Sequence, residues 1–205
     1  MNYKDIVKTA LNEVGYQGEK YRSKYSSFLD SIGWYNGIKS GECTWCAIFY
    51  DYLFAVNKGN LTYSQVRQIV CEPVKASENS GAGCIQKSNM YKGAGRWITN
   101  PSKASSGDQI FFKGSDGKIY HTGIVVDWDN SGFWVVEGST TYNGNPHSVG
   151  KKHYAFSDSK IAGFGRPDWF KFDSDPEPEK KHVYVDISAP EGCEVIVNID
   201  YHQEG

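Results

Sequence analysis

The stretch 107–137 reads GDQIFFKGSDGKIYHTGIVVDWDNSGFWVVE, and its pattern predicts a β-sheet. Three runs rich in β-branched and aromatic residues, 109–112, 121–128 and 133–137, alternate with segments of Gly, Asp, Asn, Ser and Lys that favour turns. Because short turns join antiparallel neighbours, we expect these runs to be adjacent strands of one antiparallel sheet.

The residues before this stretch carry helical patterns. Residues 3–14 place apolar side chains three or four positions apart, which predicts an amphipathic helix that ends at Gly15. Residues 44–54 are apolar over a run too long and uniform for an alternating strand, so we expect a buried helix there. Shorter helices are expected around 28–32 and 62–70.

The remaining segments complete an α+β layout. Residues 71–106 are expected to be loops with one more helix, and further strands are expected near 152–156 and 161–166. Helices first and an antiparallel sheet afterwards are typical of the α+β class, with the N-terminal helices packed on the sheet.

The C-terminal residues differ from the rest, so we expect a main domain over 1–172. Residues 173–182 are charged and contain two prolines, which predicts a linker. Residues 183–205 show two alternating apolar runs around a turn, which predicts a β-hairpin appendage. Because a lone hairpin is marginally stable in water, it would belong to a truncated binding element or mediate self-association.

Composition and charge argue against several function classes. The net charge is −2, and no basic cluster is dense enough to suggest nucleic acid as a partner. No apolar run approaches the roughly 20 residues that a membrane-spanning helix needs. Residues 1–5 lack the apolar stretch of a signal peptide, so we expect synthesis in the cytoplasm and no membrane insertion.

The five cysteines do not resemble a disulfide framework, because their number is odd and their spacing irregular. Cys43 and Cys46 have the C-x-x-C spacing of zinc and thiol redox sites. No second pair at similar spacing follows, and the residues upstream look like a loop rather than a strand. Both readings stay open as alternatives.

Three residues could together carry nucleophilic chemistry. Cys46 lies near the start of the apolar helix, where a thiolate is stabilised, although a small core residue would suit the same position. His121 begins a strand and could act as a general base, or be an exposed edge residue. Glu137 closes the next strand, so it could lie beside His121 and orient the imidazole, or be a solvated strand end.

These residues lie in motifs that resemble those of CHAP domains, the cysteine, histidine-dependent amidohydrolases/peptidases. The matches are W-C-A-x-F at 45–49, G-D-x-I-F-F at 107–112, H-x-G-I-V at 121–125, V-E-G-x-T at 136–140 and I-x-G-F-G-R-P at 161–167. They occur in the family's order, and the resemblance spans about residues 2 to 170.

The resemblance implies a papain-like fold with Cys46 as nucleophile, His121 as base and Glu137 as the orienting acid. It implies no cofactor, and bacterial peptidoglycan as substrate. Members of the family are N-acetylmuramoyl-L-alanine amidases or peptide-bridge endopeptidases, and many are phage or prophage endolysins of Gram-positive hosts. An endolysin without a signal peptide acts on the cell wall after release through a phage-made hole.

The chain departs from the family pattern near the nucleophile. Ser139 stands where the family often has Asn, and the segment 36–46 before the nucleophile is several residues longer than usual. The backbone N–H of Cys46 is expected to hold the oxyanion with one further donor. Ser139, Tyr35, Asn36 and Trp45 are the other candidates for oxyanion or substrate contacts.

No metal site is expected. Some CHAP domains hold calcium in an Asp-rich loop before the nucleophile, but no Asp-x-Asp run occurs there in this chain. The four other histidines show no ligand spacing, and we expect them to be solvated: His147, His153, His182 and His202.

Two other functions remain as alternatives. The first is a wall-binding module that has lost catalysis, which the aromatic content of 15% would suit. The second is a host autolysin or a conjugation-associated wall hydrolase, which would share the chemistry.

Overall fold

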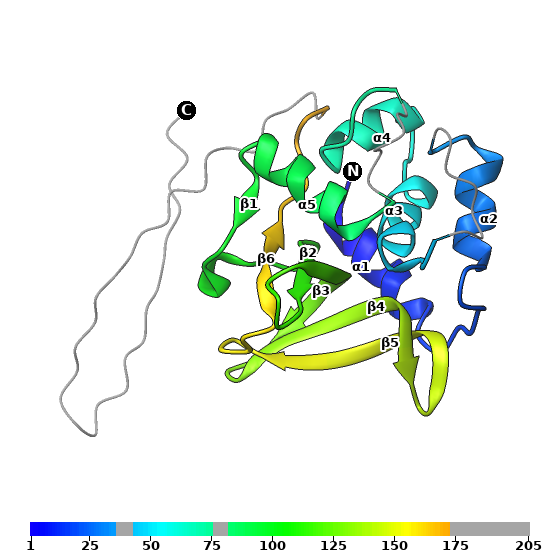
Figure 1. The fold of residues 1–205 in the computed structure, drawn as a ribbon. Coiled ribbons are helices and arrows are strands. Elements are labelled where there is room, and N and C mark those ends of the chain that lie inside the picture. Colours follow the sequence, from blue (N-terminus) through cyan, green and yellow to red (C-terminus); the bar gives the residue numbers. More distant parts are fainter. Residues whose placement is uncertain (36–42, 76–81, 173–205) are drawn as a thin grey trace, which may run out of the picture. The chain divides into compact units, whose positions relative to one another are not determined.

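The protein is described by a computed structural model that covers residues 1–35, 43–75 and 82–172 (Figure 1). These residues fall in the first of two units into which the chain divides, Met1–Ser174 and Asp175–Gly205. The predicted linker and C-terminal hairpin lie outside the described residues.

The described part has a mixed α+β fold, with helices first and an antiparallel sheet afterwards, as expected. The sheet has the strand order β1-β6-β2-β3-β4-β5. Its elements are, in chain order, α1 (Tyr3–Asn12), α2 (Lys24–Ser31), α3 (Cys46–Val56), α4 (Tyr63–Ile69), α5 (Cys84–Gly93), β1 (Trp97–Ile98), the short 3-10 helix η1 (Pro101–Lys103), β2 (Gln109–Lys113), β3 (Ile119–Trp128), β4 (Gly132–Tyr142), β5 (Asn145–Ala155) and β6 (Ile161–Gly165).

Local signals in the sequence explain where several helices begin and end. The side chain of Asn2 caps α1 by accepting a hydrogen bond from the Lys4 backbone N–H. Gly15 follows this helix with φ +95°, a conformation that glycine adopts without strain. Thr62 and Gln65 form a reciprocal capping box at the start of α4.

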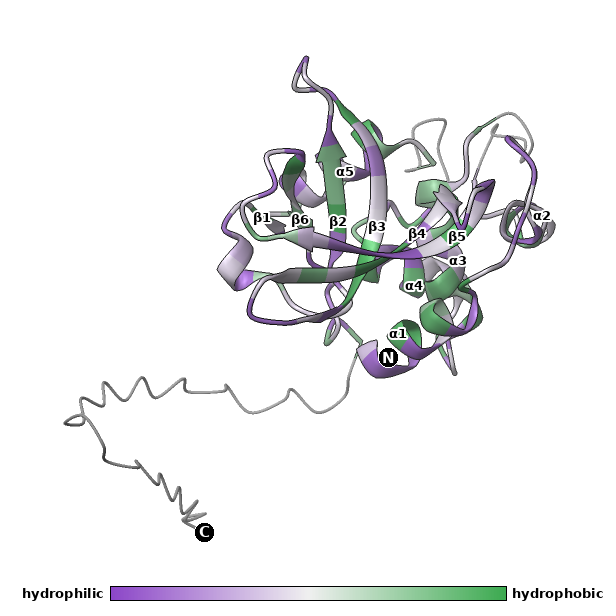
Figure 2. Cartoon of the chain, turned by 90° about the horizontal axis from the view of Figure 1, so that it is seen from below, coloured by the Kyte–Doolittle hydropathy of each residue, from purple (hydrophilic) through white to green (hydrophobic). Residues whose placement is uncertain are grey.

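Helix α3 is the centre of the main core, which confirms the expected buried helix. Nearly all its side chains are buried, and it packs against α2, β3 and β4. Helices α1 and α5 also contact β3, so the helices cover one face of the sheet (Figure 1). Figure 2 shows that hydrophobic residues concentrate on the strands and on the helices beside them.

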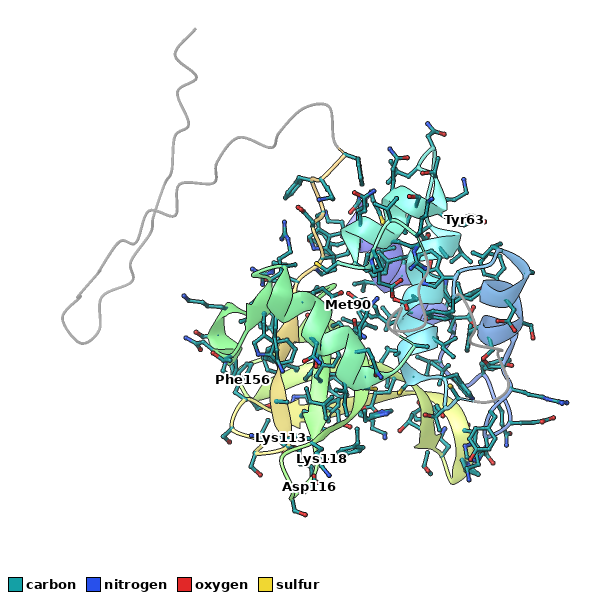
Figure 3. All side chains as sticks on the ribbon, turned by 45° about the horizontal axis from the view of Figure 1, so that its top comes forward. Tyr63, Met90, Lys113, Asp116, Lys118 and Phe156 are labelled. Atoms are coloured by element: carbon teal, nitrogen blue, oxygen red, sulfur yellow. The ribbon has the colours of Figure 1, made fainter. Side chains whose placement is uncertain are left out.

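The two faces of the sheet support two cores. Ile124 and Val126 belong to the cluster that includes the helices, whereas Val125 belongs to a second cluster on the other face of β3. This alternation follows from the two-residue period of a strand. Strands β2, β3 and β4 are neighbours as expected, and the turn with Asp116 and Lys118 projects from the body of the protein (Figure 3).

Strands β4 and β5 are longer than expected, and β1 was not anticipated. Glu137 does not end β4, because the strand continues through a register shift between Glu137 and Thr140 to Tyr142. Gly138 and Ser139, residue types that usually mark turns, here lie in a bulge within the strand.

Candidate active site

Cys46 is the first residue of α3, and its thiol is buried with 4% of the residue exposed. Trp45 precedes the helix, and no side chain caps it. The first backbone N–H groups of a helix have no partner within it, so the positive end of the helix dipole lies at the thiol. This position favours the thiolate over the thiol.

The start of α3 is fixed against the sheet by aromatic packing. Trp45 is completely buried, and its indole N–H donates a 2.8 Å hydrogen bond to the carbonyl of Glu19. A Cβ on Gly138 would lie 2.5 Å from Cβ of Phe49 and 3.1 Å from the ring of Trp45. Glycine in the bulge of β4 therefore lets the strand approach α3 closely.

His121 lies in β3, with its ring held between aromatic neighbours. Its ring stacks on Phe112 of β2 with centroids 5.9 Å apart and lies 6.2 Å from the ring of Tyr120. His121 Nε2 is 3.0 Å from Oε2 of Glu137. The expectation that Glu137 would lie beside His121 is therefore confirmed.

Gly123 makes room for this contact. Val136 pairs with Ile124 across β3 and β4, which places Glu137 beside Gly123 and diagonally from His121. A Cβ on Gly123 would lie 2.9 Å from Cγ of Glu137 and 2.7 Å from Val135. The glycine of the H-x-G motif thus allows the Glu137 side chain to cross over β3 toward the imidazole.

Glu137 is fully buried, yet it is surrounded by donors. Lys152 Nζ lies 3.0 Å from Oε2, and the hydroxyl of Tyr154 donates to Oε1. Burial alone would raise the pKa of Glu137, but His121, Tyr154 and Lys152 together lower it to about 2. Glu137 is therefore an anion at neutral pH and not the solvated strand end that we considered.

Cys46 and His121 stabilise each other's charged forms. A hydrogen bond from Cys84 and another with His121 lower the pKa of Cys46 well below its usual value, although burial opposes the shift. Burial would lower the pKa of His121, but hydrogen bonds to Cys46 and Glu137 raise it to about 10. These shifts favour a thiolate beside an imidazolium, and a thiolate is a strong nucleophile.

Cys46 lies where two cavities meet. The larger, of about 490 Å³, is lined by Cys46, His121 and Glu137 with mostly polar neighbours from β4 and β5. The smaller, of about 290 Å³, contains Cys46 and the residues around Cys84 at the start of α5. Thr44 and Tyr120 line both cavities. A chain bound across this site could therefore extend to both sides of the sulfur.

The other predicted site residues differ in whether they line a cavity. Ser139 lines the larger cavity and has φ +53°, a rare conformation for a residue other than glycine. Trp45 is a core residue, so its buried side chain cannot contact a substrate. Tyr35 is also buried, and its hydroxyl donates a 2.5 Å hydrogen bond to Asp51 rather than facing the cavities. Asn36 lies outside the described residues.

Sequence reasoning missed Cys84. Its Sγ lies 3.4 Å from Sγ of Cys46, although 38 positions separate the two residues in the chain. The C-x-x-C spacing had drawn attention to Cys43, which lines the smaller cavity. Residues 71–106 carry no sequence signal for where their helix begins, so nothing in the sequence places Cys84 beside Cys46.

The described residues contain no cluster of three or more His, Cys, Asp or Glu that could hold a metal ion. No helix among them is long and apolar enough to cross a membrane. His153 is exposed, as expected, and its Nε2 lies 3.2 Å from Oδ2 of Asp129. His182 and His202 lie outside the described residues.

Comparisons with protein families and with curated proteins found no match. Among solved structures, the chain is similar to one titled "The crystal structure of Ly7917", with a TM-score of 0.46 and 10% identity. The alignment covers 82% of this chain and 62% of that chain. This chain thus spans less than two thirds of that protein's length.

Proposed function

We propose that the protein is a papain-like cysteine hydrolase of the CHAP type, which cleaves amide or peptide bonds in bacterial peptidoglycan. The observation that carries the proposal is the chain of contacts from Cys46 through His121 to Glu137 beside an open cavity. The five motifs that resemble CHAP domains support the substrate class, because they include all three of these residues.

The reaction begins with attack of the Cys46 thiolate on a carbonyl carbon of the peptide part of peptidoglycan. The tetrahedral intermediate then collapses, and His121 gives its proton to the leaving amine. Water hydrolyses the resulting thioester, with His121 now accepting the proton of the water. Glu137 keeps the imidazole oriented and stabilises its cationic form throughout.

The oxyanion forms next to the start of α3. The backbone N–H of Cys46 is the first of that helix and has no partner within it, so it can donate to the developing charge. The absence of a capping side chain on α3 leaves this end of the helix open to an anion. Ser139, on the wall of the larger cavity, is the candidate for a substrate contact.

The residues that line the larger cavity suit a polar substrate. Its lining includes the hydroxyls of Thr140, Thr141 and Tyr154 and the ammonium groups of Lys152 and Lys160. Stem peptides carry carboxylates and amides, which such groups can bind through charge-assisted hydrogen bonds.

Digestion of purified Gram-positive peptidoglycan, followed by mass spectrometry of the soluble fragments, tests the proposal. The wild-type protein should release fragments whose new ends identify the cleaved bond as amidase or endopeptidase. Cys46→Ala, checked for folding by circular dichroism, should release none. Fragments from Cys46→Ala, or none from the wild type on several wall types, would contradict the hydrolase. In the second case, co-sedimentation with the walls would point to a binding module.

A further inference from the structure

Cys84 occupies a position in α5 that mirrors that of Cys46 in α3. Each cysteine is the first residue of its helix, and neither helix has a side chain that caps its start. The two helices pack against each other, and the sulfur atoms lie 3.4 Å apart, which is hydrogen-bond distance for a thiol. Cys84 is 8% exposed, so water competes little with this contact.

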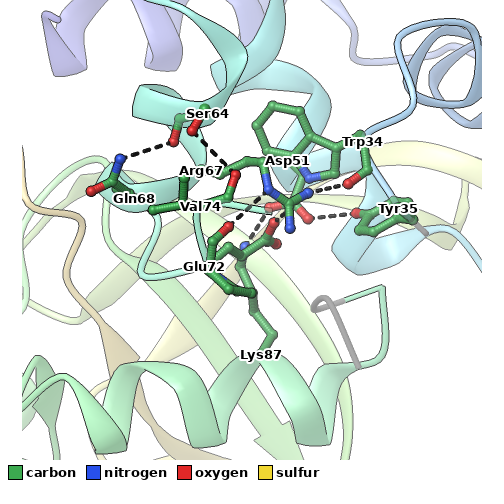
Figure 4. Close-up of polar contacts among 10 residues, drawn as sticks. Trp34, Tyr35, Asp51, Ser64, Arg67, Gln68, Glu72, Val74 and Lys87 are labelled. Carbon is green, nitrogen blue, oxygen red and sulfur yellow. Dashed lines mark hydrogen bonds and ion pairs between the residues drawn. The ribbon is translucent and has the colours of Figure 1, made fainter. Parts of the chain in front are cut away.

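A buried ion pair holds the two helices in this arrangement. Lys87, one turn after Cys84 in α5, is fully buried, and its Nζ lies 2.5 Å from Oδ1 of Asp51 in α3 and 2.6 Å from Oε1 of Glu72 (Figure 4). Asp51 also accepts the hydroxyl of Tyr35. Because a buried charge is costly unless it is paired, these contacts fix the position of α5 along α3.

We propose that the Cys84 thiol donates its proton in a hydrogen bond to the Cys46 thiolate and so keeps the nucleophile ionised and in place. This inference rests on the proposed role of Cys46 as the nucleophile. It adds to the Cys46–His121–Glu137 set a fourth side chain, which contacts the reacting sulfur atom.

The charges around the two sulfur atoms agree with this direction of donation. The hydrogen bond to Cys46 and burial raise the pKa of the Cys84 thiol well above its usual value, so Cys84 stays protonated when Cys46 has lost its proton. The backbone N–H of Ala47 also lowers the pKa of Cys46.

Other titratable groups face the same space and must be considered with Cys84. The larger cavity brings His121, Glu137, Tyr120, Lys152, Tyr154 and Lys160 toward Cys46. The smaller cavity adds Cys43. Of these groups, His121 is the one whose hydrogen bond and charge lower the pKa of Cys46. A variant of Cys84 leaves all of them unchanged.

The test is the pH profile of Cys46 alkylation by iodoacetamide, measured between pH 4 and pH 10 in the full chain with a phosphine reductant. Tryptic cleavage after Lys39 and Lys58 yields one peptide with both Cys43 and Cys46, so fragment spectra must assign the label. The variants are Cys84→Ala, which removes the donor, and Cys84→Ser, which keeps one. Cys71→Ser is the matched control, because this half-buried thiol lines neither cavity.

We expect Cys84→Ala to displace the acid limb of the Cys46 alkylation profile to higher pH, with a rate about tenfold or more slower on that limb, the effect of losing one hydrogen bond to a charged group. The rate above the new apparent pKa should stay within about twofold of the wild type, and Cys84→Ser should regain most of the loss. A Cys84→Ala profile that superimposes on the wild type would overturn the proposal, as would a Cys84→Ser variant as slow as Cys84→Ala.

Two features keep the result interpretable. If Cys84→Ala does not fold, Cys84→Val fills the space without a donor and takes its place in the same comparison. The alkylation rate needs no peptidoglycan, so a protein that releases no wall fragments but shows the expected shift contradicts only the proposed substrate.

Discussion

Oε2 of Glu137 lies 3.0 Å from Nε2 of His121, and the carboxylate is completely buried. The imidazole therefore directs its other nitrogen away from Glu137, toward the side where it interacts with Cys46. Two neighbouring strands thus supply the base and the group that orients it, while a helix supplies the nucleophile.

Glu137→Gln should weaken hydrolysis by about 100-fold or more without abolishing it. The amide can still bond to His121 but cannot stabilise its cation, and it can support the wrong tautomer. The measurement is the rate of peptidoglycan fragment release near pH 7, with Asp129→Asn as the control because its carboxylate pairs with His153 outside the cavities. Equal rates for the wild type and Glu137→Gln would show that the carboxylate has no part in catalysis.

The pH dependence of hydrolysis should be a broad bell. Because the pKa of Cys46 is lowered, the thiolate persists well below the usual thiol range, and activity should be lost only as acid protonates it. Because the pKa of His121 is raised to about 10, the imidazolium that protonates the leaving amine should be lost above about pH 10. The values of kcat/KM from pH 4 to pH 11 check this. A rate that rises only near pH 9 would indicate an ordinary thiol.

Gly123→Ala should impair catalysis more than folding. The added Cβ would lie 2.9 Å from Cγ of Glu137, so the carboxylate would have to move from His121. We expect at least about a tenfold loss of fragment release, with the basic limb of the pH profile displaced to lower pH as the imidazolium loses its partner. Gly93→Ala, at the exposed end of α5, is the control, because an added Cβ meets open space there and, as at Gly123, φ is not positive. An unchanged pH profile in Gly123→Ala would contradict this role.

The contact between His121 and Glu137 could be predicted from the sequence, because a short turn forces adjacent strands to pair. The start of α3 could also be predicted, because an apolar run of that length is more typical of a buried helix than of a strand. The motifs that resemble CHAP domains point to the same three residues.

The Cys46–Cys84 contact could not be predicted, because it depends on how two helices pack. The sequence of α5, CIQKSNMYKG, has no clear apolar face, and its most buried charged residue, Lys87, reads as a surface lysine. Only the partners Asp51 and Glu72, from two other segments, explain its burial. Likewise, the sequence around Gly138 indicates a turn. The actual reason for a glycine there is the close approach of the strand to Phe49, a tertiary contact that the sequence does not reveal.

Lys87→Met should destabilise the fold and thereby test the ion pair that aligns α5 with α3. The methionine matches the volume of lysine but leaves Asp51 buried without its cation and Glu72 with only Arg67, whose Nη1 lies 3.5 Å from Oε2 of Glu72, a change that costs about 3–5 kcal/mol. Urea unfolding at neutral pH should show this loss. Lys92→Met on the same helix is the control, since Lys92 is exposed and its Nζ lies 4.8 Å from the centroid of the Trp97 ring, so the change should alter stability by less than about 1 kcal/mol. The destabilisation should shrink as pH falls, because burial and the charge of Asp51 raise the pKa of Glu72 and this carboxyl can then become neutral. Equal stability of Lys87→Met and Lys92→Met would show that α5 is held in place by its apolar contacts alone.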